Sequence, residues 1–299
     1  MISARTGTYS IVARDPGTGA LGVAVQSHWF SVGSVVSWGR AGVGVVATQS
    51  VAEPAYGPRL LDRLQDGEDL GTALEALLAE DQAAHFRQVA AVDAAGTIAV
   101  HTGEGCIEFA GHTTGEGFSA QANMMASSQV WPAMAEAFMS ADGPLARRLL
   151  LTLDAAEGVG GDVRGRQSTA LLVVPAEGEG WRREVELRVE DHPEPLDELG
   201  RLLDLHDAYA LAAEGDDLVG KGRHEESANR YKRASQLAPD NDELLFWAGL
   251  SLAQGGEVGQ GAAMVRRAID VHRGWRDLLL RLDEEISPSA EAMRRELGI

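Results

Sequence analysis

The chain has 299 residues, a length that suits two domains better than one. It carries 26 basic and 45 acidic residues, and the formal charge of −19 makes a nucleic-acid partner unexpected because such a surface repels phosphate backbones. No stretch approaches the roughly 18 apolar residues of a membrane span, and Met1–Gly7 lacks the apolar core of a secretory signal, so we expect no membrane partner and a cytoplasmic location.

Residues 8–189 alternate between β-rich and helical patterns. Strands are predicted where apolar and β-branched residues run between Gly, Pro and Asp turns, and helices where Leu and Ala recur every three to four residues. The predicted strands are Thr8–Arg14, Ala20–Ser27, Val35–Trp38, Gly42–Thr48, Gln88–Asp93, Thr97–His101, Gly117–Met124, Ser168–Val174 and Glu184–Val189. The predicted helices are Gly57–Leu64, Leu70–Leu78, Ser128–Ser140 and Pro144–Glu157. Helices grouped in pairs between strands favour a layered α+β domain over a Rossmann fold.

The remainder of the chain reads as helices only. Two prolines in the acidic stretch Asp191–Pro195 predict a linker, which divides the chain into a domain of residues 1–191 and a helical domain of residues 192–299. The spacing of Tyr231, Ala234, Leu237, Pro239 and Asn241 resembles the end of a tetratricopeptide repeat. The expected helices are Leu205–Leu218, Glu225–Leu237, Asp242–Gln254 and Glu257–Val271.

Two repeats are few for a free-standing repeat module, so we expect this part to lean on the first domain or on a second subunit of a homo-oligomer. Its functional interpretation is binding of a peptide or protein partner. The alternative, a packing or dimerisation appendage, stays open at this stage.

Motifs for cofactors and metals are missing from the sequence. The chain has no G-x-G-x-x-G after a strand, no Walker loop, no H-E-x-x-H and no G-x-S-x-G elbow, so we expect neither a cofactor nor a metal. Its single cysteine, Cys106, lies between Glu104 and Glu108, which disfavours a reactive thiolate. We interpret Cys106 as structural.

Several segments together resemble one family. These segments are Thr8–Pro16, Gly22–Ser27, Arg40–Gln49, Ala120–Met124 and Gly160–Ser168, and in this order they resemble the DUF1028 family, a branch of the N-terminal-nucleophile (Ntn) hydrolases. The similarity runs from about Thr8 to His192. The resemblance implies a four-layer αββα sandwich and an amide-bond hydrolase. Because arginines would line its site, we expect a small polar amide or peptide as the substrate.

The resemblance also implies roles for individual residues. Thr8 lies where related enzymes carry the nucleophile, and Gly7-Thr8 resembles a Gly-Thr processing junction. Arg40 takes the position of a lysine that tunes the nucleophile, Ser27 lies beside Thr8, and Asp162 orients the amine. The remaining residues implied in binding substrate or its oxyanion are Gln49, Gln121, Asn123, Arg164 and Arg166.

This mechanism requires Thr8 to become the first residue of the chain. An N-terminal threonine supplies both the attacking hydroxyl and the α-amine that accepts its proton. Residues 1–7 precede Thr8, so the hypothesis includes removal of this leader. The alternative is a catalytically inactive binding or scaffold protein that recruits partners through its helices, with Gln121 and Asn123 as ordinary buried amides.

Overall fold

The computed structural model describes residues 5–299, with side chains from Gly7 onward. The chain forms two compact units, which comprise residues 1–200 and 201–299. The boundary between the units falls after Gly200, inside the long helix that begins at Pro195. Proline suits this first helical position, where its missing N–H would have no partner within the helix.

The first sheet of the N-terminal unit, sheet A, is centred on strand β5. Its strands are β1 (Arg5–Thr6), β4 (Ser37–Arg40), β5 (Gly44–Val51), β6 (Arg87–Asp93) and β7 (Ile98–Thr102). Their order is β1-β5-β6-β7, and β4 also pairs with β5. All pairs are antiparallel; β4 pairs with residues 44–47 of β5, and β1 pairs with residues 50–51.

The second sheet, sheet B, has β2 and β3 at its centre. It contains β2 (Thr8–Arg14), β3 (Leu21–Ser27), β8 (Gly111–Gly115), β9 (Phe118–Asn123), β10 (Ser168–Val174) and β11 (Val185–Val189) in the order β11-β10-β3-β2-β9-β8. Thr8 is paired with Ser27 on one side and with Asn123 on the other. The register therefore aligns three polar residues at one end of the sheet.

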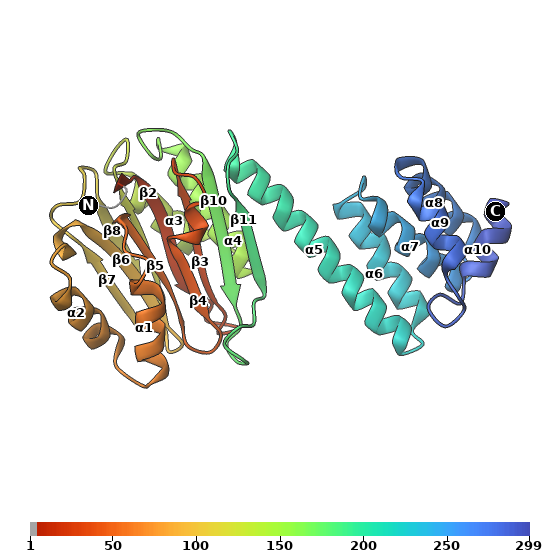
Figure 1. Cartoon of the computed structure of the whole chain (residues 1–299), viewed down its shortest axis with the longest axis horizontal. Helices are drawn as coiled ribbons and strands as arrows, with labels where there is room; N and C mark the ends of the chain where they lie inside the picture. Colours follow the sequence, from red (N-terminus) through yellow and green to blue (C-terminus); the bar gives the residue numbers. More distant parts are fainter. Residues whose placement is uncertain (1–4) are drawn as a thin grey trace. The chain divides into compact units, whose positions relative to one another are not determined.

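Helices cover the outer face of each sheet, and the N-terminal unit is a four-layer αββα sandwich (Figure 1). Helices α1 (Tyr56–Gln65) and α2 (Leu70–Glu80) pack on sheet A, and α3 (Val130–Ser140) and α4 (Leu145–Gly158) pack on sheet B. Two short 3₁₀ helices occupy residues Val32–Ser34 and Ala84–Phe86. The predicted fold class is confirmed.

The interface between the two sheets is apolar at one end and polar at the other. The apolar part is built from inward-facing residues such as Val12, Val23, Val45 and Val92, all fully buried. Because side chains alternate along a strand, the same faces continue into Ser10 on β2 and Gln49 on β5. These polar side chains are equally buried, and burial of polar groups is tolerated only where hydrogen bonds compensate it.

The chain crosses from sheet A to sheet B at Gly7. Residues 5 and 6 pair with Val51 and Ser50 of β5, whereas Thr8 begins β2 of the other sheet. The peptide bond between Gly7 and Thr8 therefore lies between the two sheets at their polar end.

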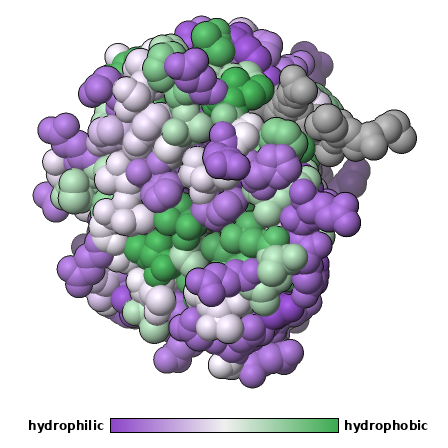
Figure 2. Space-filling view, turned by 90° about the vertical axis from the view of Figure 1, so that its left-hand side faces the viewer, coloured by the Kyte–Doolittle hydropathy of each residue, from purple (hydrophilic) through white to green (hydrophobic). Residues whose placement is uncertain are grey.

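Outer strands of the two sheets border one face of the N-terminal unit. Figure 2 shows this face, on which hydrophobic side chains gather between hydrophilic ones. Strand β7, the last strand of sheet A, is half-buried along its whole length. Across residues 5–299, no helix combines the length and the hydrophobicity that crossing a membrane requires.

The C-terminal unit is all-helical. Helix α5 (Pro195–Gly220) leads into α6 (His224–Leu237), α7 (Asp242–Gln254), α8 (Val258–Val271), α9 (Gly274–Arg281) and α10 (Ala290–Leu297). Asn241 caps α7 by accepting a 2.9 Å hydrogen bond from the amide of Leu244. Gly249 and Gly261 let α7 and α8 approach closely, since a β-carbon at Gly249 would lie 2.6 Å from the Gly261 carbonyl oxygen.

Candidate active site

The hydroxyl of Thr8 points into the polar end of the inter-sheet interface. Thr8 Oγ1 donates a 3.1 Å hydrogen bond to Ser27 Oγ on the neighbouring strand β3. Both side chains are fully buried. The predicted proximity of Ser27 to Thr8 is thus confirmed, and it follows from their direct pairing in the β2–β3 register.

The carbonyl oxygen of Gly7 accepts two hydrogen bonds. Ser27 Oγ donates one of them, and Arg164 Nη2 donates the other at 2.8 Å. A hydroxyl and a guanidinium that converge on one carbonyl oxygen polarise the C=O bond and stabilise negative charge on that oxygen. The Gly7–Thr8 peptide therefore carries an oxyanion-type donor pair on its carbonyl and the Thr8 hydroxyl on its nitrogen side.

Asp162 holds the Arg164 side chain in place. Its carboxylate accepts from Arg164 Nη2 at 2.7 Å and from Arg164 Nε at 3.1 Å, and it also accepts from the backbone amide of His28 at 3.2 Å. The Asp162 side chain is fully buried, so the fork-shaped pairing with arginine compensates the cost of desolvating the carboxylate. Asp162 therefore contacts Arg164 in this structure.

The space around Gly7 is narrow. A β-carbon at this position would lie 2.9 Å from Arg164 Nη2 and 2.9 Å from Asp162 Oδ2. Side chains rarely approach so closely, so any larger residue would push the ion pair away from the carbonyl oxygen.

A network of buried amides surrounds the carbonyl group of Thr8 itself. Gln49 Nε2 donates to Thr8 O at 3.2 Å, and Asn123 Nδ2 donates to the same oxygen at 3.4 Å. Both amides also donate to Gln88 Oε1, at 2.8 and 3.0 Å. The side-chain amides of Gln49 and Asn123 therefore donate to the Thr8 backbone carbonyl and to Gln88. This agrees with the alternative interpretation of buried amides whose hydrogen bonds are satisfied within the protein.

The remaining amide of the predicted set, Gln121, lies one step further from Thr8. Gln121 Nε2 donates to Ser10 Oγ at 2.6 Å, and Ser10 Oγ donates in turn to Gln49 Oε1 at 2.6 Å. Ser119 Oγ donates to Gln121 Oε1 at 2.9 Å. Gln121 therefore positions its neighbours and has no contact with the Gly7 carbonyl oxygen.

Gln88 is the residue at this site that the sequence analysis missed. Its Oε1 joins Gln49 and Asn123, and its Nε2 donates to Ala122 O at 2.9 Å and to Thr102 Oγ1 at 3.0 Å. The available signal was its place as a buried-strand glutamine before the apolar run Val89–Val92 of β6; in the structure it pairs with Gln49. The network ends at His112, whose pKa is lowered by burial and by nearby His101.

The prediction that Arg40 lies beside Thr8 is wrong. Arg40 ends β4 and pairs with Gly44, at the end of β5 remote from Gln49. Its guanidinium forms a 2.8 Å ion pair with Asp62 of α1 and also donates to Gln65. Spacing in sequence suggested this position, but the pairing of β4 with β5 turns the arginine toward α1; Arg164 supplies the positive charge at Gly7.

Arg166 also lies apart from the Gly7–Thr8 bond. Its guanidinium contacts Glu194 at 2.8 Å and Glu157 at 3.5 Å. Glu157 in turn accepts a 2.6 Å hydrogen bond from Tyr9, whose pKa is raised by burial and by this carboxylate. The two arginines predicted to bind substrate thus differ, because only Arg164 reaches the site.

Comparison with known proteins identifies the N-terminal unit. The model of a family of unknown function, DUF1028, matches residues 8–199. The chain belongs to this family. A TPR repeat model matches residues 215–256 in the C-terminal unit.

A solved structure agrees with the assignment to DUF1028. The crystal structure of a DUF1028 protein from Silicibacter pomeroyi is 35% identical, covers 66% of this chain and 88% of its own, and superposes with a TM-score of 0.61. Anbu (ancestral beta-subunit) from Yersinia bercovieri is 14% identical, with a TM-score of 0.33 and coverage of 65% and 94% of the two chains, too distant to support an argument. Among curated proteins, none matches the chain.

Proposed function

We propose that the N-terminal unit is an amide-bond hydrolase whose nucleophile is the Thr8 hydroxyl, released when the leader of residues 1–7 is cut off. The observation that carries the proposal is the pair of donors, Ser27 Oγ and Arg164 Nη2, on the Gly7 carbonyl oxygen next to the Thr8 hydroxyl. This arrangement supports cleavage of the Gly7–Thr8 bond by Thr8 itself, because the hydroxyl lies next to a carbonyl whose developing negative charge has two donors.

The proposed release proceeds in two steps. Thr8 Oγ1 adds to the Gly7 carbonyl carbon, the C–N bond breaks, and the hydroxyl proton passes to the departing Thr8 nitrogen. Water then hydrolyses the resulting ester between Gly7 and Thr8 Oγ1. Negative charge on the Gly7 oxygen during the first step is stabilised by Arg164 and Ser27.

Removal of Gly7 also creates the hydrolase site. The freed α-amine of Thr8, with an ordinary pKa of about 7.7–8.0, becomes the general base for the hydroxyl. Arg164 loses the Gly7 carbonyl as a partner while Asp162 still holds its guanidinium. We propose that Arg164 then binds the polarised carbonyl or a carboxylate of a small amide or peptide substrate.

The test is turnover of a panel of small amides and short peptides by the mature protein. We expect activity in the wild type, retention in Thr8→Ser, which keeps a hydroxyl, and loss in Thr8→Ala. Equal turnover by wild type and Thr8→Ala would refute the assignment of the nucleophile. Circular dichroism spectra that match between the variants exclude misfolding as the cause of a loss.

A second candidate function is a binding or scaffold protein without catalysis. One observation favours it: Arg40, the expected partner charge, pairs with Asp62 instead. In this case the helices of the C-terminal unit recruit a partner. A mature protein that retains residues 1–7 and turns over no amide would favour this function.

A further inference from the structure

A cavity of about 440 Å³ opens within the C-terminal unit. Helices α5, α6 and α7 form most of its wall, and the segment between α9 and α10 contributes Ile286 and Ser287. Its volume lies within the roughly 300–1,000 Å³ range of ligand sites. All residues that line it belong to the C-terminal unit, so the cavity is independent of the Thr8 chemistry.

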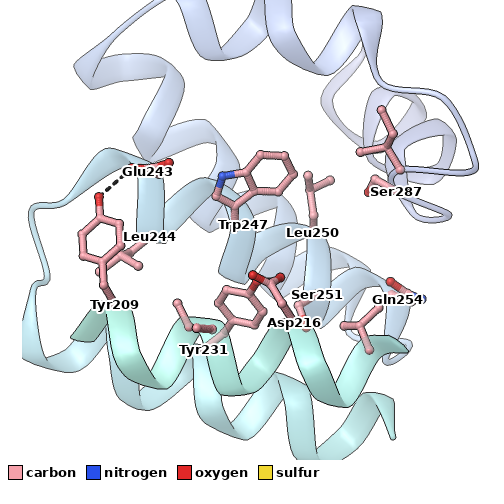
Figure 3. A pocket seen from close by; sticks show the side chains of 14 residues that line it. Tyr209, Asp216, Tyr231, Glu243, Leu244, Trp247, Leu250, Ser251, Gln254 and Ser287 are labelled. Atoms are coloured by element: carbon pink, nitrogen blue, oxygen red, sulfur yellow. Dashed lines mark hydrogen bonds between the residues drawn. The ribbon is translucent and has the colours of Figure 1, made fainter. Parts of the chain in front are cut away.

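Aromatic rings supply much of the cavity wall. Tyr209 comes from α5, Tyr231 from α6 and Trp247 from α7, and Figure 3 shows the three rings around one space. Gly215 on α5 makes room for the Tyr231 ring, because a β-carbon there would lie 2.8 Å from a ring carbon. Tyr231 is consequently only 4% exposed, and its ring is fixed in position.

Each tyrosine is hydrogen-bonded to a carboxylate of the same wall. Tyr209 donates to Glu243 Oε2 at 2.6 Å, and Tyr231 donates to Asp216 Oδ1 (Figure 3). Burial, together with the adjacent carboxylate, raises the pKa of both phenols, so they stay protonated and keep donating near neutral pH. The two tyrosine hydroxyls therefore orient the carboxylates, and no Lys, Arg or His among the residues lining the cavity pairs with them.

The charge of the lining points to one class of ligand. The described residues that line the cavity include two acids, Asp216 and Glu243, and no Lys, Arg or His. Anions are repelled by this set, whereas a cation gains attraction both from the carboxylates and from the faces of the aromatic rings. A planar cation that stacks on rings and pairs with carboxylates in a fork-like geometry is a guanidinium.

We infer that this cavity binds the side chain of an arginine presented by a peptide or protein partner. Trp247 and Tyr209 stack on the guanidinium, Tyr231 holds Asp216 in place, and Asp216 and Glu243 accept the guanidinium N–H groups. Lysine fits less well because its ammonium is more strongly hydrated and does not stack. A partner that binds the helical repeats would therefore present an arginine to this cavity.

The test uses the full-length protein and isothermal titration calorimetry with a blocked peptide, acetyl-Gly-Arg-Gly-amide. The matched neutral probe replaces arginine by citrulline, which keeps the shape and removes the charge. We expect saturable binding of the arginine peptide, weaker binding of the lysine peptide and no measurable binding of the citrulline peptide. Added salt weakens the binding of the arginine peptide.

Two variants assign the binding to this cavity. Asp216→Asn and Glu243→Gln each remove a charge but keep an oxygen that accepts from the tyrosine, and we expect each to weaken binding by about fivefold or more. Asp217→Asn is the control, since Asp217 is the neighbouring acid on α5 and does not line the cavity. It should bind like the wild type.

Three results would overturn the inference: no binding of the arginine peptide by wild type, equal binding of the citrulline peptide, or equal losses in Asp217→Asn and Asp216→Asn. The peptide comparison on wild-type protein stands even if a variant fails to fold. None of these results depends on whether Thr8 is a nucleophile.

Discussion

Arg164 donates a 2.8 Å hydrogen bond from Nη2 to the carbonyl oxygen of Gly7, across 157 positions of sequence. The contact joins the loop before β10 to the residue at which the chain passes between the two sheets. A charged donor therefore lies on the one peptide bond whose cleavage would give the protein a new N-terminus at Thr8.

Replacement of Arg164 by glutamine removes this charged donor. We expect leader release to slow by about 10²–10³-fold, the usual cost of losing one oxyanion donor. The measurement is the rate of loss of residues 1–7 by time-resolved mass spectrometry after synthesis. Arg166→Gln is the matched control because Arg166 contacts Glu194 and Glu157 instead, and it should process at the wild-type rate. Equal slowing in both variants would contradict the role given to Arg164.

Gly7→Ala tests the close fit around the same carbonyl. The added methyl group would lie 2.9 Å from Arg164 Nη2 and must displace the Arg164–Asp162 pair. We expect slower leader release and a loss of about 1–3 kcal/mol in the free energy of unfolding of the unprocessed protein, the range for overpacked sites. Urea titration of a Thr8→Ala background, which keeps the leader, measures the second quantity. An unchanged unfolding midpoint there would show that the site is looser than described.

Gln88→Met is expected to lower the free energy of unfolding, because Gln88 is fully buried. The substitution keeps the shape of the side chain but leaves the amides of Gln49 and Asn123 without their shared acceptor. We expect a loss of about 1–3 kcal/mol for each buried donor left unpaired. Chemical denaturation checks this, with Gln167→Met as the comparison because Gln167 pairs with Asp191 outside the core. A neutral effect of Gln88→Met would mean that the network does not contribute to stability.

Asp81 gives the stability of the N-terminal unit a pH dependence. Its pKa is lowered chiefly by the hydrogen bond from Arg87, an arginine that also donates to the Val51 carbonyl at the end of β5. A carboxyl with a depressed folded-state pKa stabilises the protein above its unfolded pKa of about 3.9 and loses that contribution as the pH falls further. Asp81→Asn should therefore lower the unfolding free energy at pH 7, and the difference from wild type should shrink in acid. A difference that grew on acidification would contradict this sign.

Periodicity was enough to place most elements of the fold. The predicted strand Ser168–Val174 and helix Asp242–Gln254 agree with the structure to the residue, and Thr8–Arg14 is likewise confirmed. Strand β8 was missed because its sequence, Gly-His-Thr-Thr-Gly, has no apolar alternation and is defined only by pairing with β9. Helices α9 and α10 were also not anticipated.

The candidate site was predictable in composition but not in geometry. The resemblance to the DUF1028 family implied Ser27, Gln49 and Asn123, which lie on three different strands, β3, β5 and β9. The charged group beside Gly7 could not be identified from the sequence. Only the folded chain shows that Arg40 pairs with Asp62 and that Arg164 reaches the Gly7 carbonyl. The position of Arg40 in the sequence favoured it as the charge beside Thr8, but the folded chain places Arg164 next to Gly7 instead.

The intact mass of the purified protein tests the central claim most directly. We predict that wild-type protein loses residues 1–7 and begins at Thr8, whereas Thr8→Ala keeps them under the same conditions. Active wild-type protein that retains Met1, or a Thr8→Ala variant cleaved at the same bond, would contradict the account of Thr8 as the residue that frees and then uses its own amine.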